Sequence, residues 1–200
     1  TVGATEVTLE VNPSTVERTR LPGFRQAGVN RLSIGIQSFD DVVLKRLGRA
    51  HRAQEGEATL SAARSAGFDN LSVDLIHTVP GEDLEVVRRD VETLLAFQPE
   101  HVSAYGLTIE DGTPYARAVE QGRLQNPSES DAVAMLEEVW SSIEGAGYRH
   151  YEISSFARPG FESCHNRHYW ARDPVLGLGI GAASLDPSVG DVPHGVRRQN

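Results

Sequence analysis

Four short apolar runs recur in the first half of the chain, and each carries a polar residue at or near its end. They are Val7–Glu10, Leu32–Gln37, Leu71–Ile76 and Val102–Thr108. Helical segments separate them, most clearly between positions 84 and 95, where apolar residues recur at helical spacing. Alternation of β-branched runs with helical segments is typical of parallel βα units rather than of a hairpin sheet.

The pattern also predicts where helices begin and end. The segment Ser14–Ala27 has helical character, but we expect Pro22-Gly23 to break it and Thr19 to cap a second short helix. A separate helix is expected over Gln54–Ala66, ending at Gly67. Ser128-Glu-Ser-Asp131 is typical of the capping box that opens a helix.

The chain has 200 residues, whereas a closed eight-stranded barrel needs about 250. We therefore expect an α/β fold with part of a parallel (β/α) barrel, and the start of the chain directly before a strand favours a truncated barrel. After Thr108 the rhythm changes, and the later sequence predicts strands over Tyr151–Phe156 and Leu176–Leu185. We place a domain boundary near residue 110, with barrel units in 1–110 and a smaller α+β region in 111–200.

Charge and cysteine content narrow the class of protein. The chain has 28 acidic against 19 basic residues, a net charge of −9 and no cluster of basic residues, which argues against nucleic acid as a partner. No apolar run approaches the roughly 20 residues of a membrane-spanning helix. With Cys164 as its one cysteine, the chain forms no internal disulfide, which fits a reducing compartment and predicts a cytoplasmic protein.

Polar side chains at strand ends are the first candidates for a site. Glu10, Gln37 and Asp74 fall at the predicted carboxyl ends of three strands, where parallel barrels carry their chemistry. Asp74 lies in an apolar run, so its carboxylate needs a partner. From the residues alone, a rim carboxylate paired with an arginine and an amide bonded to loop backbone remain alternatives to a ligand site.

Several longer motifs resemble one family. They are Leu9–Pro13, Gly28–Asp40, Leu47–Arg49 with His51, Val73–Ile76 with Pro80-Gly81, and Ile109–Pro114. These stretches resemble the oxygen-independent coproporphyrinogen III oxidase family of radical S-adenosylmethionine proteins. The runs His150–Ala157 and Cys164–Trp170 are most similar to the haem chaperone branch of that family. The resemblance is collinear and covers nearly the whole chain.

The resemblance implies a radical S-adenosylmethionine barrel and a set of ligand-binding residues. By position in the motifs, Glu10, Gln37, Arg49, Asp74 and Thr108 would bind S-adenosylmethionine. The fork of Arg49 suits the methionine carboxylate, and the Glu10 carboxylate suits ribose hydroxyls or an ammonium group. A surface salt bridge for Arg49 and ordinary strand packing for Thr108 are the alternatives.

The family also uses a four-iron–four-sulfur (4Fe-4S) cluster, held by three cysteines. One cysteine does not replace three thiolates, so we expect the cluster ligands and the glycine-rich loop of the family upstream of this chain. Two motifs depart from the family pattern: Thr78-Val-Pro-Gly81 stands in place of Gly-Leu-Pro-Gly, and Gly181-Ala-Ala183 in place of Gly-Ala-His.

The resemblance to the chaperone branch also implies haem. An imidazole or a thiolate can ligate haem iron, which makes His165 and Cys164 the candidate ligands, with Tyr169 and Trp170 flanking the macrocycle. Docking of the smaller region on the barrel is the alternative role for this run.

Three functions follow. The first is a haem chaperone that binds haem or porphyrin and passes haem to an acceptor protein, with any membrane association running through that acceptor. The second is the oxidase, in which the reduced cluster and S-adenosylmethionine generate a radical that abstracts hydrogen from a porphyrinogen. The third is an unrelated barrel hydrolase, which would not bind S-adenosylmethionine.

Overall fold

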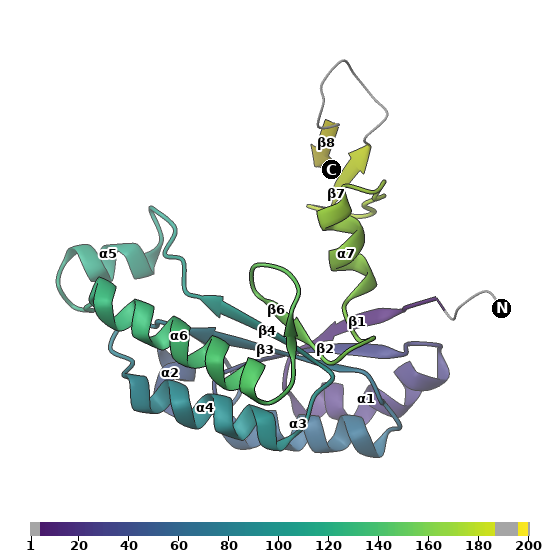
Figure 1. Cartoon of the computed structure of the whole chain (residues 1–200), viewed down its shortest axis with the longest axis horizontal. Coiled ribbons are helices and arrows are strands. Elements are labelled where there is room, and N and C mark those ends of the chain that lie inside the picture. The colour runs from purple at the N-terminus through teal and green to yellow at the C-terminus, as the bar shows by residue number, and fades with distance from the viewer. Residues whose placement is uncertain (1–4, 187–195, 200) are drawn as a thin grey trace. The chain divides into compact units, whose positions relative to one another are not determined.

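The computed structural model describes residues 5–186 and 196–199. The chain divides into two compact units, Thr1–Phe161 and Glu162–Asn200. The first unit contains a six-stranded sheet in the order β1-β2-β3-β4-β6-β5 (Figure 1). Its strands are β1 Thr8–Val11, β2 Arg31–Gln37, β3 Leu71–His77, β4 His101–Gly106, β5 Arg149–His150 and β6 Ser155–Ala157. Strands β1 to β4 are parallel, which confirms the mostly parallel α/β sheet.

Helices lie along one side of this sheet (Figure 1). The helices of the unit are α1 Thr15–Gln26, α2 Asp41–Arg46, α3 Ala53–Ser65, α4 Leu84–Ala96, α5 Pro114–Glu120 and α6 Glu129–Gly145, of which α1, α3, α4 and α6 cover the sheet. Alternate strand residues, such as Leu32, Ile34 and Val73, are fully buried in the core against them. Because side chains alternate along a strand, the intervening residues face the opposite side.

The predicted helix ends are confirmed where local chemistry decides them. The Ser128 hydroxyl accepts from the Asp131 backbone N–H at 3.1 Å and opens α6. Gly67 follows the end of α3 with a φ of 83°, a left-handed conformation that glycine adopts without strain.

The expected break at Pro22 is wrong, because α1 continues through this residue. Proline lacks the N–H that would bond to the preceding turn. Leu21 is fully buried and Phe24 packs on the core, so burial of this face offsets the lost hydrogen bond. Thr19 caps no second helix, and its hydroxyl donates to the Val16 carbonyl at 2.8 Å instead.

The strand expected over Tyr151–Phe156 is wrong for most of that range, because residues 151–154 connect two short strands, β5 before them and β6 after them. Strand β6 pairs antiparallel with both β4 and β5, and the Tyr151 backbone N–H donates to the Ser155 carbonyl at 3.1 Å in the connection. These strands extend the sheet past β4, so the first compact unit reaches beyond residue 110. The domain boundary expected there stays a prediction about the organisation of the whole protein.

The second unit contains one helix and a two-stranded antiparallel sheet among its described residues. Its elements are α7 Cys164–Ala171, β7 Ala183–Asp186 and β8 Val196–Gln199. Of the strand expected over Leu176–Leu185, only the last part is regular, because Gly179 and Gly181 turn the chain at φ values of 99° and 77°. Among the described residues, no helix is both long and apolar enough to span a membrane.

Candidate functional site

The face of the sheet opposite the helices is polar along neighbouring strands. Glu10 on β1 pairs in register with Ser33 on β2, and Asp74 on β3 pairs with Ser103 on β4. Because register partners point to the same side, these four side chains share one face, where they can meet a ligand rather than the apolar core.

Asp74 lies at the centre of this face. Its carboxylate accepts hydrogen bonds from the Ser33 hydroxyl at 3.3 Å and from the Ser103 side chain, which confirms the expectation of a partner. The pKa of Asp74 is raised to about 6, chiefly by burial and also by the negative charge of Glu10, whereas the two serine hydrogen bonds and Arg31 act in the opposite direction. The expected position at the end of its strand is wrong, because β3 continues for three residues to His77.

The side chains of Gln37 and Arg49 come together over Gly35 on β2 and form a second polar group. The Arg49 Nη2 atom donates to the Asn12 side-chain oxygen and to the Gly35 carbonyl, the latter at 3.3 Å. Gln37 ends β2 with a φ of 69°, an uncommon left-handed conformation for a residue with a side chain. Its Nε2 atom would lie 2.9 Å from a Cβ built at Gly35, so the amide folds back over the glycine.

Both groups lie on the same face. Asn12 follows Glu10 by two residues on β1, and Gly35 follows Ser33 by two residues on β2, so alternation keeps them on one side. One part of the face therefore offers carboxylates as acceptors, and the adjacent part offers a guanidinium as donor. This arrangement suits a ligand that carries hydroxyl or cationic groups and an anionic group.

Asn12, Gly35 and Ser33 were not predicted from the sequence. The available signal for Asn12 and Ser33 was the two-residue alternation that starts from Glu10 and the apolar positions of β2. Thr108 lies beyond the end of β4 and is exposed. Tyr105 on β4 is 43% exposed, and its hydroxyl bonds to Ser103 with Asp74 nearby.

The candidate haem residues lie in the second unit. Cys164 and His165 are exposed in the first turn of α7. The His168 Nδ1 atom lies 2.6 Å from the Asp173 carboxylate, and the exposed rings of Tyr169 and Trp170 meet edge to face with centroids 6.0 Å apart. The haem-binding role of Cys164 and His165 stays a prediction.

The residues present do not fit an iron–sulfur cluster. The chain has one cysteine, and within the described ranges no three histidine, cysteine, aspartate or glutamate side chains gather as metal ligands. A polar face with a buried Arg49 Nε atom that has no partner among these residues does fit an anionic ligand group.

Comparison with known proteins gives consistent relatives. Residues 2–94 match the model of the radical SAM superfamily. The chain is 37% identical over 194 residues to the heme chaperone HemW of Bacillus subtilis, covering 94% of this chain and 51% of that protein. It is 44% identical over 177 residues to the mouse mitochondrial radical S-adenosyl methionine domain-containing protein 1, covering 88% of this chain and 40% of that protein. The chain thus spans about half the length of these relatives or less.

A solved structure of another protein has the same fold. The structure of coproporphyrinogen III oxidase (HemN) from Escherichia coli superimposes with a TM-score of 0.75 and 24% identity over 90% of this chain and 44% of that one. An identity this low speaks for a shared fold alone. Residues 2–94 therefore carry a radical SAM domain, and the chain is similar to the heme chaperone HemW over nearly its whole length.

Proposed function

We propose that the full-length protein is a haem chaperone with a radical S-adenosylmethionine fold, which binds haem and passes it to an acceptor protein. The observation that carries this proposal is the 37% identity to the heme chaperone HemW over 94% of the chain. The oxidase alternative has weaker support, because the likeness to coproporphyrinogen III oxidase is 24% in identity.

We infer that the polar face of the first unit binds S-adenosylmethionine. The Arg49 guanidinium would hold the carboxylate, since its buried Nε atom has no partner among the described residues. Glu10 and Asp74 would accept hydrogen bonds from the ribose hydroxyls or the ammonium group. Gln37 would orient the ligand through its amide, and Thr108 would approach the adenosyl group from the segment after β4. The ligands of the 4Fe-4S cluster would come from outside this sequence.

Haem would bind to the second unit. His165 is exposed on α7, and the same helix carries the half-exposed rings of Tyr169 and Trp170, at 42% and 50% exposure. An exposed imidazole suits an iron ligand, and exposed aromatic rings on the same helix suit contact with a flat macrocycle. Cys164 is the second candidate, as an exposed thiol one residue earlier.

The location and the partners are part of the same proposal. A cytoplasmic protein fits the single cysteine. The partner is a haem-acceptor protein, and any contact with a membrane would run through that acceptor.

The S-adenosylmethionine site is tested on the full-length protein by calorimetry. Arg49→Ala should weaken binding by about 1.5–3 kcal/mol, the range for hydrogen bonds to charged groups. Arg88→Ala is the matched control, because Arg88 pairs with Glu138 at 2.9 Å on the helical side of the sheet. Unchanged affinity in Arg49→Ala would remove this residue from the site.

The chaperone and oxidase functions are separated by two assays on full-length protein with its cluster reconstituted under anaerobic conditions. We expect haem to bind with a Soret shift and to pass to apomyoglobin as a probe acceptor. We expect no decarboxylation of coproporphyrinogen III. Porphyrinogen turnover would favour the oxidase, and absence of haem binding would end the chaperone proposal.

A further inference from the structure

We propose that Asn12 is a positioning residue that fixes the Arg49 guanidinium over Gly35, and that it thereby sets the preference of the site for ligands with a carboxylate. The inference rests on the proposed function in one respect, because it takes S-adenosylmethionine as the ligand. Asn12 lies just past β1, two residues after Glu10, and its side chain is exposed on the polar face.

The contacts of Arg49 leave part of its guanidinium for a ligand. Both hydrogens of Nη2 have protein acceptors, one the Asn12 side-chain oxygen and one the Gly35 carbonyl at 3.3 Å. The Nε atom is buried and has no partner among the described residues. A buried donor without an acceptor costs free energy, and a carboxylate beside it would supply the missing acceptor in the charge-assisted form that arginine favours.

Gly35 leaves the space in which the Arg49 and Asn12 side chains meet, because it has no side chain of its own. A Cβ built on Gly35 would lie 2.9 Å from Gln37 Nε2, 3.3 Å from Arg49 Nη2 and 3.5 Å from Asn12 Oδ1. Three polar side chains from three separate segments therefore converge over one backbone position that has no side chain. The atoms that a methyl group would meet are the far ends of flexible chains, so alanine at this position displaces them without disturbing the core.

The Asn12 side chain bonds to Arg49 alone among the described residues. Truncating this exposed side chain opens no cavity, so its loss should act on Arg49 rather than on the fold. The consequence should be confined to the ligand group that Arg49 binds.

The test compares two ligands on full-length protein. S-adenosylmethionine and its decarboxylated analogue share the sulfonium, ribose and adenine groups, but only the first has a carboxylate. In Asn12→Ala we expect affinity for S-adenosylmethionine to fall roughly tenfold, the size of one hydrogen bond to a charged group, with affinity for the analogue unchanged.

Two further variants complete the test. Gly35→Ala should weaken binding of both ligands, and of S-adenosylmethionine more, because its methyl group displaces the ends of both Gln37 and Arg49. Asn126→Ala changes an exposed asparagine in the segment before α6 and should bind both ligands like wild type. Equal loss for both ligands in Asn12→Ala, or no loss for either, would overturn the positioning role. Wild-type protein that binds neither ligand would instead overturn the proposed site.

Discussion

Asp74 shows how its surroundings set the charge of a single carboxylate. Burial favours the neutral acid and raises the pKa to about 6, while hydrogen bonds from Ser103 and Ser33 limit the rise. The carboxylate is therefore mostly ionised at pH 7.5 and mostly neutral at pH 5. Only the ionised form accepts hydrogen bonds with both oxygens and attracts a cationic ligand.

This titration predicts a pH dependence of binding. Affinity of full-length protein for S-adenosylmethionine should fall by about tenfold at pH 5, one unit below the Asp74 pKa, if the ionised form is required. Calorimetry between pH 5 and pH 7.5 measures it, with Asp74→Asn as the comparison. The variant should bind weakly with little pH dependence in this range. An unchanged pH profile in Asp74→Asn would assign the titration to another group.

For single residues, the sequence pattern predicts which face of the sheet they lie on, but it does not predict which side chains contact one another. Glu10 and Asp74 are predicted as strand-end residues; Asp74 lies within β3 instead, and its polar side chain between apolar neighbours still places it on the polar face. The contact of Arg49 with Asn12 over Gly35 cannot be predicted in this way, since it depends on how far the Arg49 side chain reaches back from the segment after α2. The departure at Thr78 is also explained only by contacts: its φ is 60°, and its hydroxyl accepts from the Leu107 N–H at 3.1 Å, which ties the ends of β3 and β4 together.

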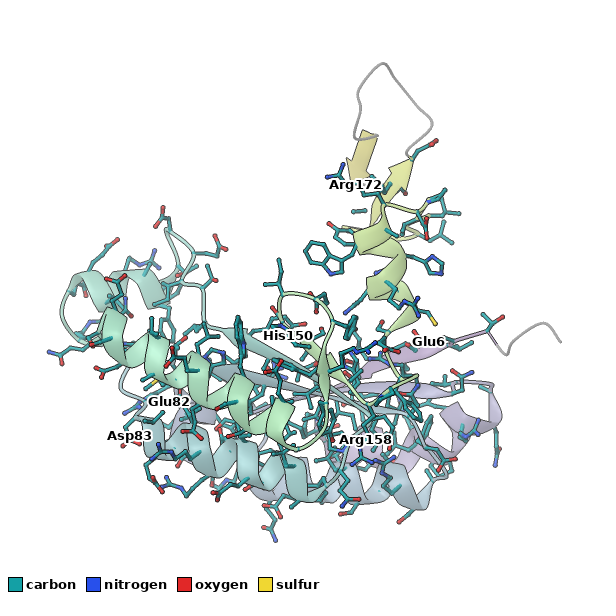
Figure 2. All side chains as sticks on the ribbon, viewed as in Figure 1. Glu6, Glu82, Asp83, His150, Arg158 and Arg172 are labelled. Atoms are coloured by element: carbon teal, nitrogen blue, oxygen red, sulfur yellow. The ribbon has the colours of Figure 1, made fainter. Side chains whose placement is uncertain are left out.

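At the scale of elements, the turn between β3 and α4 contains one buried acid, Glu82, which is labelled in Figure 2. One oxygen of Glu82 accepts from the Val79 backbone N–H at 3.0 Å, and its other oxygen is buried without a partner among the described residues. The pKa of Glu82 is raised to about 7 from its ordinary 4.5, chiefly by burial and also by the negative charge of Asp90. The folded state thus favours the protonated acid.

The sign of the effect on stability follows from linkage. The Glu82 contribution is fully present below pH 4.5, the unfolded value, and is lost as the pH rises through about 7. The difference corresponds to about 3 kcal/mol. Glu82→Gln cannot ionise, so denaturant unfolding of full-length protein should lose less stability between pH 5 and pH 8 than wild type does.

Asp74 and Asp90 titrate in the same range, so the informative quantity is the difference between variant and wild type at each pH. Glu137→Gln, which changes an exposed carboxylate on α6, is the control and should follow wild type. Equal pH dependence in Glu82→Gln and wild type would contradict a buried acid in this turn.

Local chemistry predicts the elements better than pairing between distant segments does. The start of α6 at Ser128 and the end of α3 at Gly67 involve neighbours in sequence and are confirmed. The helix through Pro22 and the division of residues 149–157 into β5 and β6 depend on burial and on strand partners elsewhere in the chain. Contacts between segments far apart in the chain leave no periodic pattern in the sequence.

At the scale of the whole molecule, the two units carry the two proposed ligands separately. The first unit supplies the polar face proposed for S-adenosylmethionine, and the second supplies α7 with its histidines and exposed rings. The haem assignment can therefore be tested without altering any residue of the polar face.

The two histidines of α7 differ in their contacts. The His168 Nδ1 atom lies 2.6 Å from the Asp173 carboxylate, and the His168 carbonyl accepts from the Asp173 N–H at 2.9 Å. These contacts hold the end of the helix. The ring of His165 is exposed and makes no hydrogen bond within the described residues, so both of its nitrogens remain open to a metal ion.

We therefore expect His165→Ala to weaken haem binding to full-length protein more than His168→Ala does. Loss of an axial ligand changes the electronic state of the iron, so the Soret band reports it directly. His168→Ala should mainly lower the melting temperature, because it removes the contact with Asp173. Haem titration of both variants, after their melting profiles have been compared with wild type, separates ligation from folding. An unchanged Soret band and affinity in a folded His165→Ala protein would refute the ligand assignment and turn the search to Cys164.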